Sequence, residues 1–175
     1  MNNSFTIGKF KVTSDKVRIS DPCYDLDTWC AGTVNKVKDG DWEAYVVKSD
    51  NRCAVLVAHH KDHKIKNNDH KFRKQSINIG VDSGQAGIFD LKYFKDDKVV
   101  AKVKRQCKNS ICEDEPWYSI CCDRTLGKVG AGVIPFGCVS SSGYGDGSYI
   151  YSTAKIKGKV VAIKINFGII EEEKF

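Results

Sequence analysis

Four short polar segments stand at the ends of stretches whose apolar residues alternate as in β-strands. They are "SDPCYDLDTWC" from Ser20, "VDSGQAG" from Val81, "PWYSICCD" from Pro116 and the serine- and glycine-rich "SSSGYGDGSY" from Ser140. Their carboxylates accept hydrogen bonds from hydroxyls and amines, their hydroxyls and backbone N–H groups bind phosphate or ribose oxygens, and their rings stack on flat groups. We therefore expect a site for a small polar ligand where these segments meet.

The residues assigned to this site are candidates for binding or for catalysis. The ligand-binding candidates are Asp21, Tyr24, Trp29, Asp82, Ser83, Gln85, Trp117, Tyr118, Ser140, Ser141, Ser142, Tyr144 and Asp146. The catalytic candidates are Asp82 and Asp146 as acid and base, and Cys122 as a nucleophile. Neighbouring carboxylates can divide acid–base work when their surroundings differ, whereas a thiol needs a base such as histidine within reach. Whether this protein is an enzyme is left open at this point.

Each segment also has a purely structural explanation. Asp21-Pro22 is typical of a turn start, and Asp82 followed by Ser83 and Gly84 is typical of a turn closed by an aspartate side chain. The three glycines at 143, 145 and 147 do not form a dinucleotide-binding fingerprint, because no helical pattern follows them. A glycine-rich hairpin is therefore the alternative to a ligand-binding rim.

The eight cysteines, at positions 23, 30, 53, 107, 112, 121, 122 and 138, are expected to be thiols. The first residues, MNNSFTIGKFKV, lack the apolar core of a signal peptide, so we expect a cytoplasmic protein. The chain also lacks the run of about 20 apolar residues that a membrane span requires. Only Cys107 and Cys112 are spaced loosely like zinc ligands, so neither a metal nor a cofactor is predicted.

The positive charge is modest, with 28 Lys and Arg against 22 Asp and Glu and a formal net charge of +6. Residues 61–74 form one basic stretch that contains or adjoins all four histidines and reads as an exposed loop. Aromatic residues are scarce there and no nucleic-acid-binding module surrounds it, so a nucleic-acid partner is disfavoured.

Alternation with a period of two dominates the chain and predicts a mainly β protein. We expect strands near residues 5–12, 17–19, 52–60 and 76–84, and a hairpin around Asp39-Gly40. The strand 52–60, a continuous apolar run, should pair with the preceding strand across a turn at Ser49-Asp50-Asn51. A short helix should start at Pro116 and end near Gly127, and three final strands should form a meander. The predicted fold is one domain, residues 1–175, built as an antiparallel sandwich or half-open barrel with one or two short helices.

The same segments resemble an uncharacterised family of bacterial and phage proteins. The resemblance is carried by "ISDPCY", "GVDSGQAGIFD", "WYSICCD", "GAGVIPFGCVSSSGYGDGSY" and "VVAIKINF". The chain is also similar to a wider domain of unknown function that ends in a G-D-G-x-Y strand pair. The resemblance spans Ile19 to Phe167 and implies one compact domain in a bacterial or phage-infected cytoplasm, without an activity that can be assigned to residues.

Together these observations favour a binding protein for a small polar ligand without turnover. A nucleotide-like compound is the first expectation, as for a phage protein that sequesters a host signalling molecule and so antagonises host defence. One alternative is a hydrolase or transferase that uses Asp82 and Asp146, or Cys122. The other is a module that binds a host protein through a sheet face or an edge strand.

Overall fold

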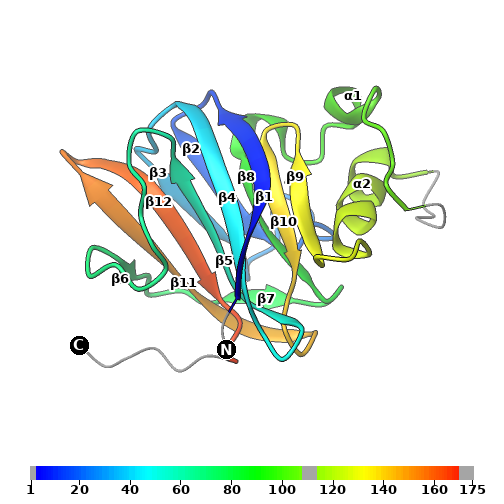
Figure 1. Ribbon diagram of the computed structural model, residues 1–175. Helices are drawn as coiled ribbons and strands as arrows, with labels where there is room; N and C mark the ends of the chain where they lie inside the picture. The colour runs from blue at the N-terminus through cyan, green and yellow to red at the C-terminus, as the bar shows by residue number, and fades with distance from the viewer. Residues whose placement is uncertain (1–2, 108–113, 170–175) are drawn as a thin grey trace.

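Two antiparallel β-sheets face each other in the computed structural model, which describes residues 3–107 and 114–169 (Figure 1). The larger sheet has the order β1-β4-β5-β12-β11-β6, and β7 extends it by pairing with β11. Its strands are β1 Asn3–Val12, β4 Gly40–Ser49, β5 Arg52–His60, β6 Arg73–Lys74, β7 Ile79–Val81, β11 Gly147–Ile156 and β12 Lys159–Asn166.

The smaller sheet has the order β3-β2-β8-β10-β9. Its strands are β2 Lys16–Ser20, β3 Gly32–Asn35, β8 Gln85–Asp90, β9 Ala131–Ile134 and β10 Gly137–Ser141. The described residues therefore form the sandwich that the alternating pattern predicted, and the mainly β fold class is confirmed.

The main core lies between the two sheets and is built from alternate residues of their strands. Ile19 and Ile88 from the smaller sheet face Trp42, Leu56 and Ile163 from the larger one, all fully buried. This alternation is what places the polar residues of each strand on the outer faces or at the strand ends.

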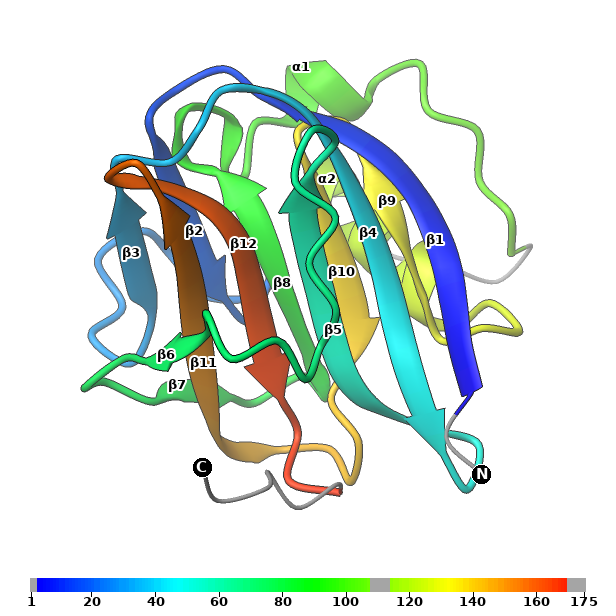
Figure 2. The ribbon, with the colours of Figure 1, turned by 60° about the vertical axis from the view of Figure 1, so that its left-hand side comes forward.

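Each outer face is covered by a further layer. Helix α2 (Pro116–Thr125), with α1 (Asp97–Val100) and the short helix Leu91–Tyr93, packs against the smaller sheet around Trp117 (Figure 1). Residues 61–72, called the strap below, cross the outer face of the larger sheet (Figure 2). The strap is a loop with mostly exposed residues, as its charge suggested, but Ile65 is buried against Ala154 and Ala162 and holds it to the sheet.

Two predicted pairings are wrong because their strands lie in different sheets. β3 pairs with β2 and β4 pairs with β1 and β5, so Asp39-Gly40 carries the chain from one sheet to the other instead of closing a hairpin. The final strands do not form a meander either: β9 and β10 form one hairpin in the smaller sheet, and β11 and β12 form another in the larger sheet.

Other local predictions are confirmed. β4 and β5 form a hairpin across Asp50 and Asn51, which both have the positive φ that a tight two-residue turn requires. Helix α2 begins at Pro116, at the position in the first turn where proline is favoured. Among the helices of residues 3–107 and 114–169, none is both long and apolar enough to cross a lipid bilayer.

Candidate functional site

Asp21 connects the first two polar segments from a fully buried position after β2. Its carboxylate accepts hydrogen bonds from Cys23 N (2.8 Å), Asp82 N (2.8 Å), Ser83 N (2.7 Å) and Ser83 Oγ (2.6 Å). A buried carboxylate is tolerated only when it is hydrogen-bonded in this way. These bonds fix the loop after β2 to the turn between β7 and β8.

The glycine-rich segment joins the same turn at Gly84. Asp146 Oδ1 accepts a hydrogen bond from Gly84 N at 2.9 Å, and Ser142 N donates to Gly84 O, also at 2.9 Å. Tyr149 Oη donates to the carbonyls of Ser142 and Gly145 and so supports the glycine-rich turn from behind. The second and fourth segments are therefore connected although about 60 residues separate them in the sequence.

The remaining segment forms part of helix α2, whose Tyr118 and Cys122 lie beside Ser83 and Gln85 at the turn between β7 and β8. Gln85 Nε2 lies 3.4 Å from Cys122 Sγ, and Thr125 Oγ1 lies 3.1 Å from Gln85 Oε1. The hydroxyl of Tyr118 lies close enough to Cys122 and Ser83 for both to affect its pKa. All four segments thus converge at one place, which we call the junction: residues 21–24, 82–85, 118–125 and 142–146.

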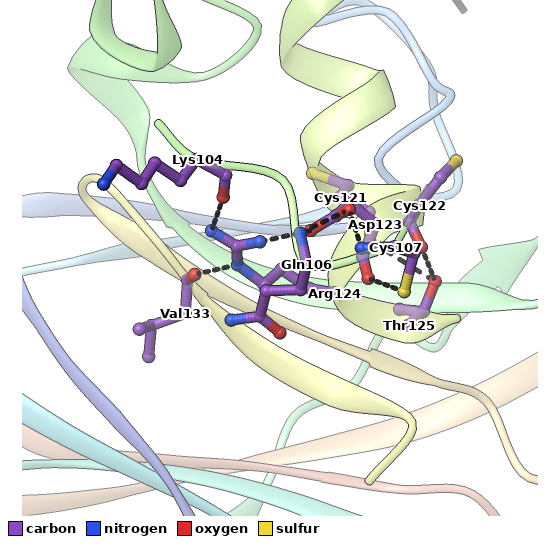
Figure 3. A network of polar contacts seen from close by, with 9 residues as sticks. All are labelled: Lys104, Gln106, Cys107, Cys121, Cys122, Asp123, Arg124, Thr125 and Val133. Atoms are coloured by element: carbon purple, nitrogen blue, oxygen red, sulfur yellow. Dashed lines mark hydrogen bonds and ion pairs between the residues drawn. The ribbon is translucent and has the colours of Figure 1, made fainter. Parts of the chain in front are cut away.

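A buried ion pair fixes the C-terminal end of α2. Asp123 is fully buried and forms an ion pair with Arg124, and it accepts hydrogen bonds from the backbone N–H groups of Gln106 and Cys107 (Figure 3). Arg124 also donates to the carbonyls of Lys104 and Val133. These contacts tie the chain before α2 to the helix and to β9, and so hold Cys122 at a defined position.

The thiols at the junction differ in their surroundings. Burial, together with the hydrogen bond to Asp21, raises the pKa of the Cys23 thiol to about 12, so Cys23 stays protonated at neutral pH. Burial likewise raises the pKa of Tyr118, which adds a neutral hydroxyl between Cys122 and Ser83. Cys23, Ser83 and Tyr118 are partly exposed, so the junction offers a protonated thiol and two hydroxyls that can donate or accept hydrogen bonds.

Two carboxylates point outward at the rim of this cluster. Asp82 is exposed, and within the described part of the chain its carboxylate makes no hydrogen bond; only its backbone N–H is used, by Asp21. Asp146 is also exposed and uses one oxygen for Gly84 N. Both side chains can accept hydrogen bonds from a ligand.

Several predicted site residues lie at the edge of the junction or beyond it. The hydroxyl of Tyr24 and the thiol of Cys30 both lie beside Gly80. Tyr144 is 73% exposed beneath the guanidinium of Arg52, whose carbon lies 4.8 Å from the ring centre. Trp29 is 89% exposed.

The structure places other predicted residues in packing roles. Trp117 is buried between Phe89 and Phe94, in edge-to-face contact with both rings. Ser140 and Ser142 are buried and hydrogen-bond to nearby backbone carbonyls, and Ser141 is half-buried. A structural role thus accounts for the side chains of Ser140 and Ser142, although the segment is not the predicted hairpin: it connects β10 in the smaller sheet to β11 in the larger one. A ligand would reach the segment through Tyr144 and Asp146.

The histidines lie away from Cys122. His59 and His60 are buried at the end of β5 in the larger sheet, and His63 and His70 belong to the strap. Cys122 lies on α2, which packs against the smaller sheet. The base that a cysteine nucleophile needs is therefore not supplied by a histidine.

Sequence reasoning missed several buried charged residues that hold loops in place. Asp90, fully buried at the opposite end of the sandwich, accepts hydrogen bonds from Thr13, Ser14 and Lys92 much as Asp21 does from its own neighbours. Arg18 is buried beneath the loop after β2 and donates to the carbonyls of Leu26 and Thr28. The only signal in the sequence was a charged residue in or next to an apolar run.

Within residues 3–107 and 114–169, no three or more His, Cys, Asp or Glu side chains are grouped so as to hold a metal ion. The seven cysteines in these ranges are free of disulfides, while Cys112 lies outside the described residues. Comparison of the chain with protein-family models, with curated proteins and with solved structures finds no match.

Proposed function

We propose that the protein binds a small polar ligand at the junction. The observation that carries this proposal is the hydrogen bonding of Asp21, which fixes two loops to each other beneath a cluster of partly exposed hydroxyls and thiols. A rigid arrangement of donors and acceptors lowers the entropic cost of binding, and this is the usual design of small-molecule sites.

The groups at the junction suit a ligand that combines hydroxyls with a flat ring. Asp82 offers two unused carboxylate oxygens to ligand hydroxyls or amines, and Ser83 and Tyr118 offer hydroxyls beside it. Arg52, above the ring of Tyr144, supplies a cation for a phosphate group. A nucleotide or cyclic dinucleotide is therefore the class to test first.

We further propose, from the resemblance to bacterial and phage proteins, that this binding sequesters a host signalling nucleotide in the cytoplasm. Sequestration needs tight binding and no turnover. The neutral Cys23, the absence of a histidine beside Cys122 and the exposed positions of Asp82 and Asp146 all favour binding over catalysis. The alternatives of a hydrolase or transferase, and of a host-protein module, have no comparable support from the geometry.

Isothermal titration of the protein with a panel of nucleotides and cyclic dinucleotides tests the proposal. Removing a single hydroxyl in Tyr118→Phe should weaken binding about 2- to 10-fold, the value of one neutral hydrogen bond. The matched control is Tyr93→Phe, in which the ring stacks on Phe136 away from the junction and should bind as the wild type does. A panel that gives no heat with the wild-type protein would remove the proposal.

A further inference from the structure

A cluster of lysines forms where two segments far apart in the sequence meet at the other end of the sandwich. The chain leaving β3 contributes Lys36 and Lys38, and the β11–β12 hairpin contributes Lys155, Lys157 and Lys159. Val37 and Val160 form a β-bridge, in which Lys38 N donates to Val160 O at 2.9 Å and Val160 N donates to Lys36 O at 2.8 Å. Figure 2 shows the tip of this hairpin beside the chain that follows β3.

This lysine cluster carries most of the excess charge of the protein. The chain has 28 Lys and Arg and 22 Asp and Glu, so without these five lysines 23 basic residues would face 22 acidic ones. Lys36, Lys155, Lys157 and Lys159 are exposed and have no ion pair within the described residues. Only Lys38 is paired, with Asp62 at 3.6 Å.

The backbone holds these lysines together in spite of their mutual repulsion. Lys36 and Lys157 both have positive φ, at 57° and 50°, a conformation that is unfavourable for residues other than glycine. The pKa of the neighbouring His63 is lowered by burial first, then by the charges of Lys38 and His60, and least by Lys157, while Asp62 opposes the shift. A concentrated, fixed positive surface of this kind attracts polyanions.

The neighbouring hollow does not account for these lysines. It encloses about 500 Å³ and its charged lining is balanced, with Lys11, Lys38 and Lys61 against Asp39, Asp41 and Asp62. Lys36, Lys155, Lys157 and Lys159 lie outside its lining. A small anion in the hollow would therefore meet as many carboxylates as amines.

We propose that this lysine cluster binds the phosphate backbone of nucleic acid without reading its sequence. Lysine ammonium groups act as point charges toward phosphates, and no arginine among the five provides the bidentate geometry used to read guanine. The large exposed apolar side chains of the described residues are Phe5, Leu26, Trp29, Ile77, Leu126 and Tyr144. None belongs to the two lysine segments, so the cluster lacks the apolar anchors of a membrane-binding surface. The sequence disfavoured nucleic acid because its one continuous basic stretch, residues 61–74, has few aromatic residues and no known module around it. The lysine cluster could not be seen there, because the fold assembles it from two segments far apart in the sequence.

Fluorescence anisotropy with a short fluorescein-labelled DNA duplex, between about 50 and 200 mM KCl, tests this proposal. One phosphate contact for each of the four lysines without an ion pair predicts that log K falls with log [KCl] with a slope of about −3.6. The triple variant Lys36→Gln, Lys157→Gln, Lys159→Gln should reduce the slope to about −1 and weaken binding at low salt. The control triple variant Lys98→Gln, Lys102→Gln, Lys128→Gln removes the same charge from exposed positions elsewhere and should keep the wild-type slope.

Three results would overturn the proposal. The first is that the wild-type protein does not change the anisotropy of the duplex at low salt. The second is that the two triple variants weaken binding equally, which would make net charge the sole cause. Binding to vesicles of phosphatidylserine and phosphatidylcholine without binding to the duplex would instead assign the lysine cluster to a membrane surface. Circular dichroism of both triple variants checks that the sandwich is retained.

Discussion

Replacing Asp21 by asparagine tests how the junction is held. The carboxylate accepts two hydrogen bonds at each oxygen: Asp82 N and Ser83 N at Oδ2, and Cys23 N and Ser83 Oγ at Oδ1. Asparagine has nearly the same shape but replaces one oxygen by an N–H donor. Whichever oxygen is lost, at least one buried backbone N–H then faces another donor.

The expected cost follows from the number of donors that lose their acceptor. If the amide nitrogen takes the Oδ1 position, the Ser83 hydroxyl can rotate and accept, which leaves only Cys23 N without a partner. One buried unsatisfied donor costs about 1–3 kcal/mol, and the remaining bonds lose the added strength of a charged acceptor. We therefore expect Asp21→Asn to lower the free energy of unfolding by about 2–4 kcal/mol, a large part of the total for a domain of this size.

Urea denaturation followed by circular dichroism measures this loss as a fall in the midpoint concentration at constant m-value. Two further variants serve as references for the stability loss of Asp21→Asn. Asp90→Asn removes a comparable buried acceptor at the other end of the sandwich and should destabilise the fold similarly. Asp82→Asn changes an exposed carboxylate and should stay within about 0.5 kcal/mol of the wild type. An Asp21→Asn protein as stable as Asp82→Asn would refute the role given to Asp21.

Three further predictions concern the surroundings of the junction. With a pKa of about 12, the thiolate fraction of Cys23 at pH 8 is about a thousandfold below that of a thiol whose pKa is 9.0. Cys23 should therefore react slowly with iodoacetamide, at a rate that rises toward high pH. Rapid alkylation at pH 8 would contradict this assignment. Trp117→Ala should lower the free energy of unfolding by about 3–5 kcal/mol because the ring is buried, whereas Trp29→Ala at an exposed position should change it by less than about 0.5 kcal/mol in the same urea titration; similar losses in both would be evidence against the packing described. Asp123→Asn should release the chain before α2, so trypsin should cut after Lys104 faster than in the wild type, and an unchanged cleavage rate would count against the anchoring role of this carboxylate.

The strands were predictable where a local pattern determined them. Alternating apolar residues gave β1, a continuous apolar run gave β5, the Asp50-Asn51 turn gave the β4–β5 hairpin, and Pro116 gave the start of α2. Each of these signals acts within about ten residues, where backbone sterics and turn chemistry decide the outcome.

The assignment of each strand to one of the two sheets was not predictable in the same way. Asp39-Gly40 has the composition of a hairpin turn, yet β3 pairs with β2 in the smaller sheet and β4 joins the larger sheet. Burying the apolar faces of both sheets against each other outweighs the local preference of the turn. Likewise, the charge of the strap suggested a solvated loop, but Ile65 and Phe72 anchor it to the larger sheet. One or two apolar residues in a basic stretch leave too weak a pattern to reveal this.

The candidate site was predictable as a set of segments, and less so as a set of side chains. The segments containing Asp21, Ser83, Tyr118 and Asp146 were all selected from the sequence, and the structure brings them together. Which hydroxyls face inward was not predictable, because strand register and helix orientation decide that Ser140 is buried and Tyr144 is exposed.

Native mass spectrometry after incubation with a small-molecule extract of bacterial cells tests the central claim most directly. We expect the wild-type protein to retain a non-covalent adduct of the mass of a nucleotide or cyclic dinucleotide. Asp90→Asn should retain it, because that carboxylate lies at the other end of the sandwich, and Asp21→Asn should lose it at the same protein concentration. A wild-type protein that carries no adduct, or equal retention by both variants, would contradict a binding site built on Asp21.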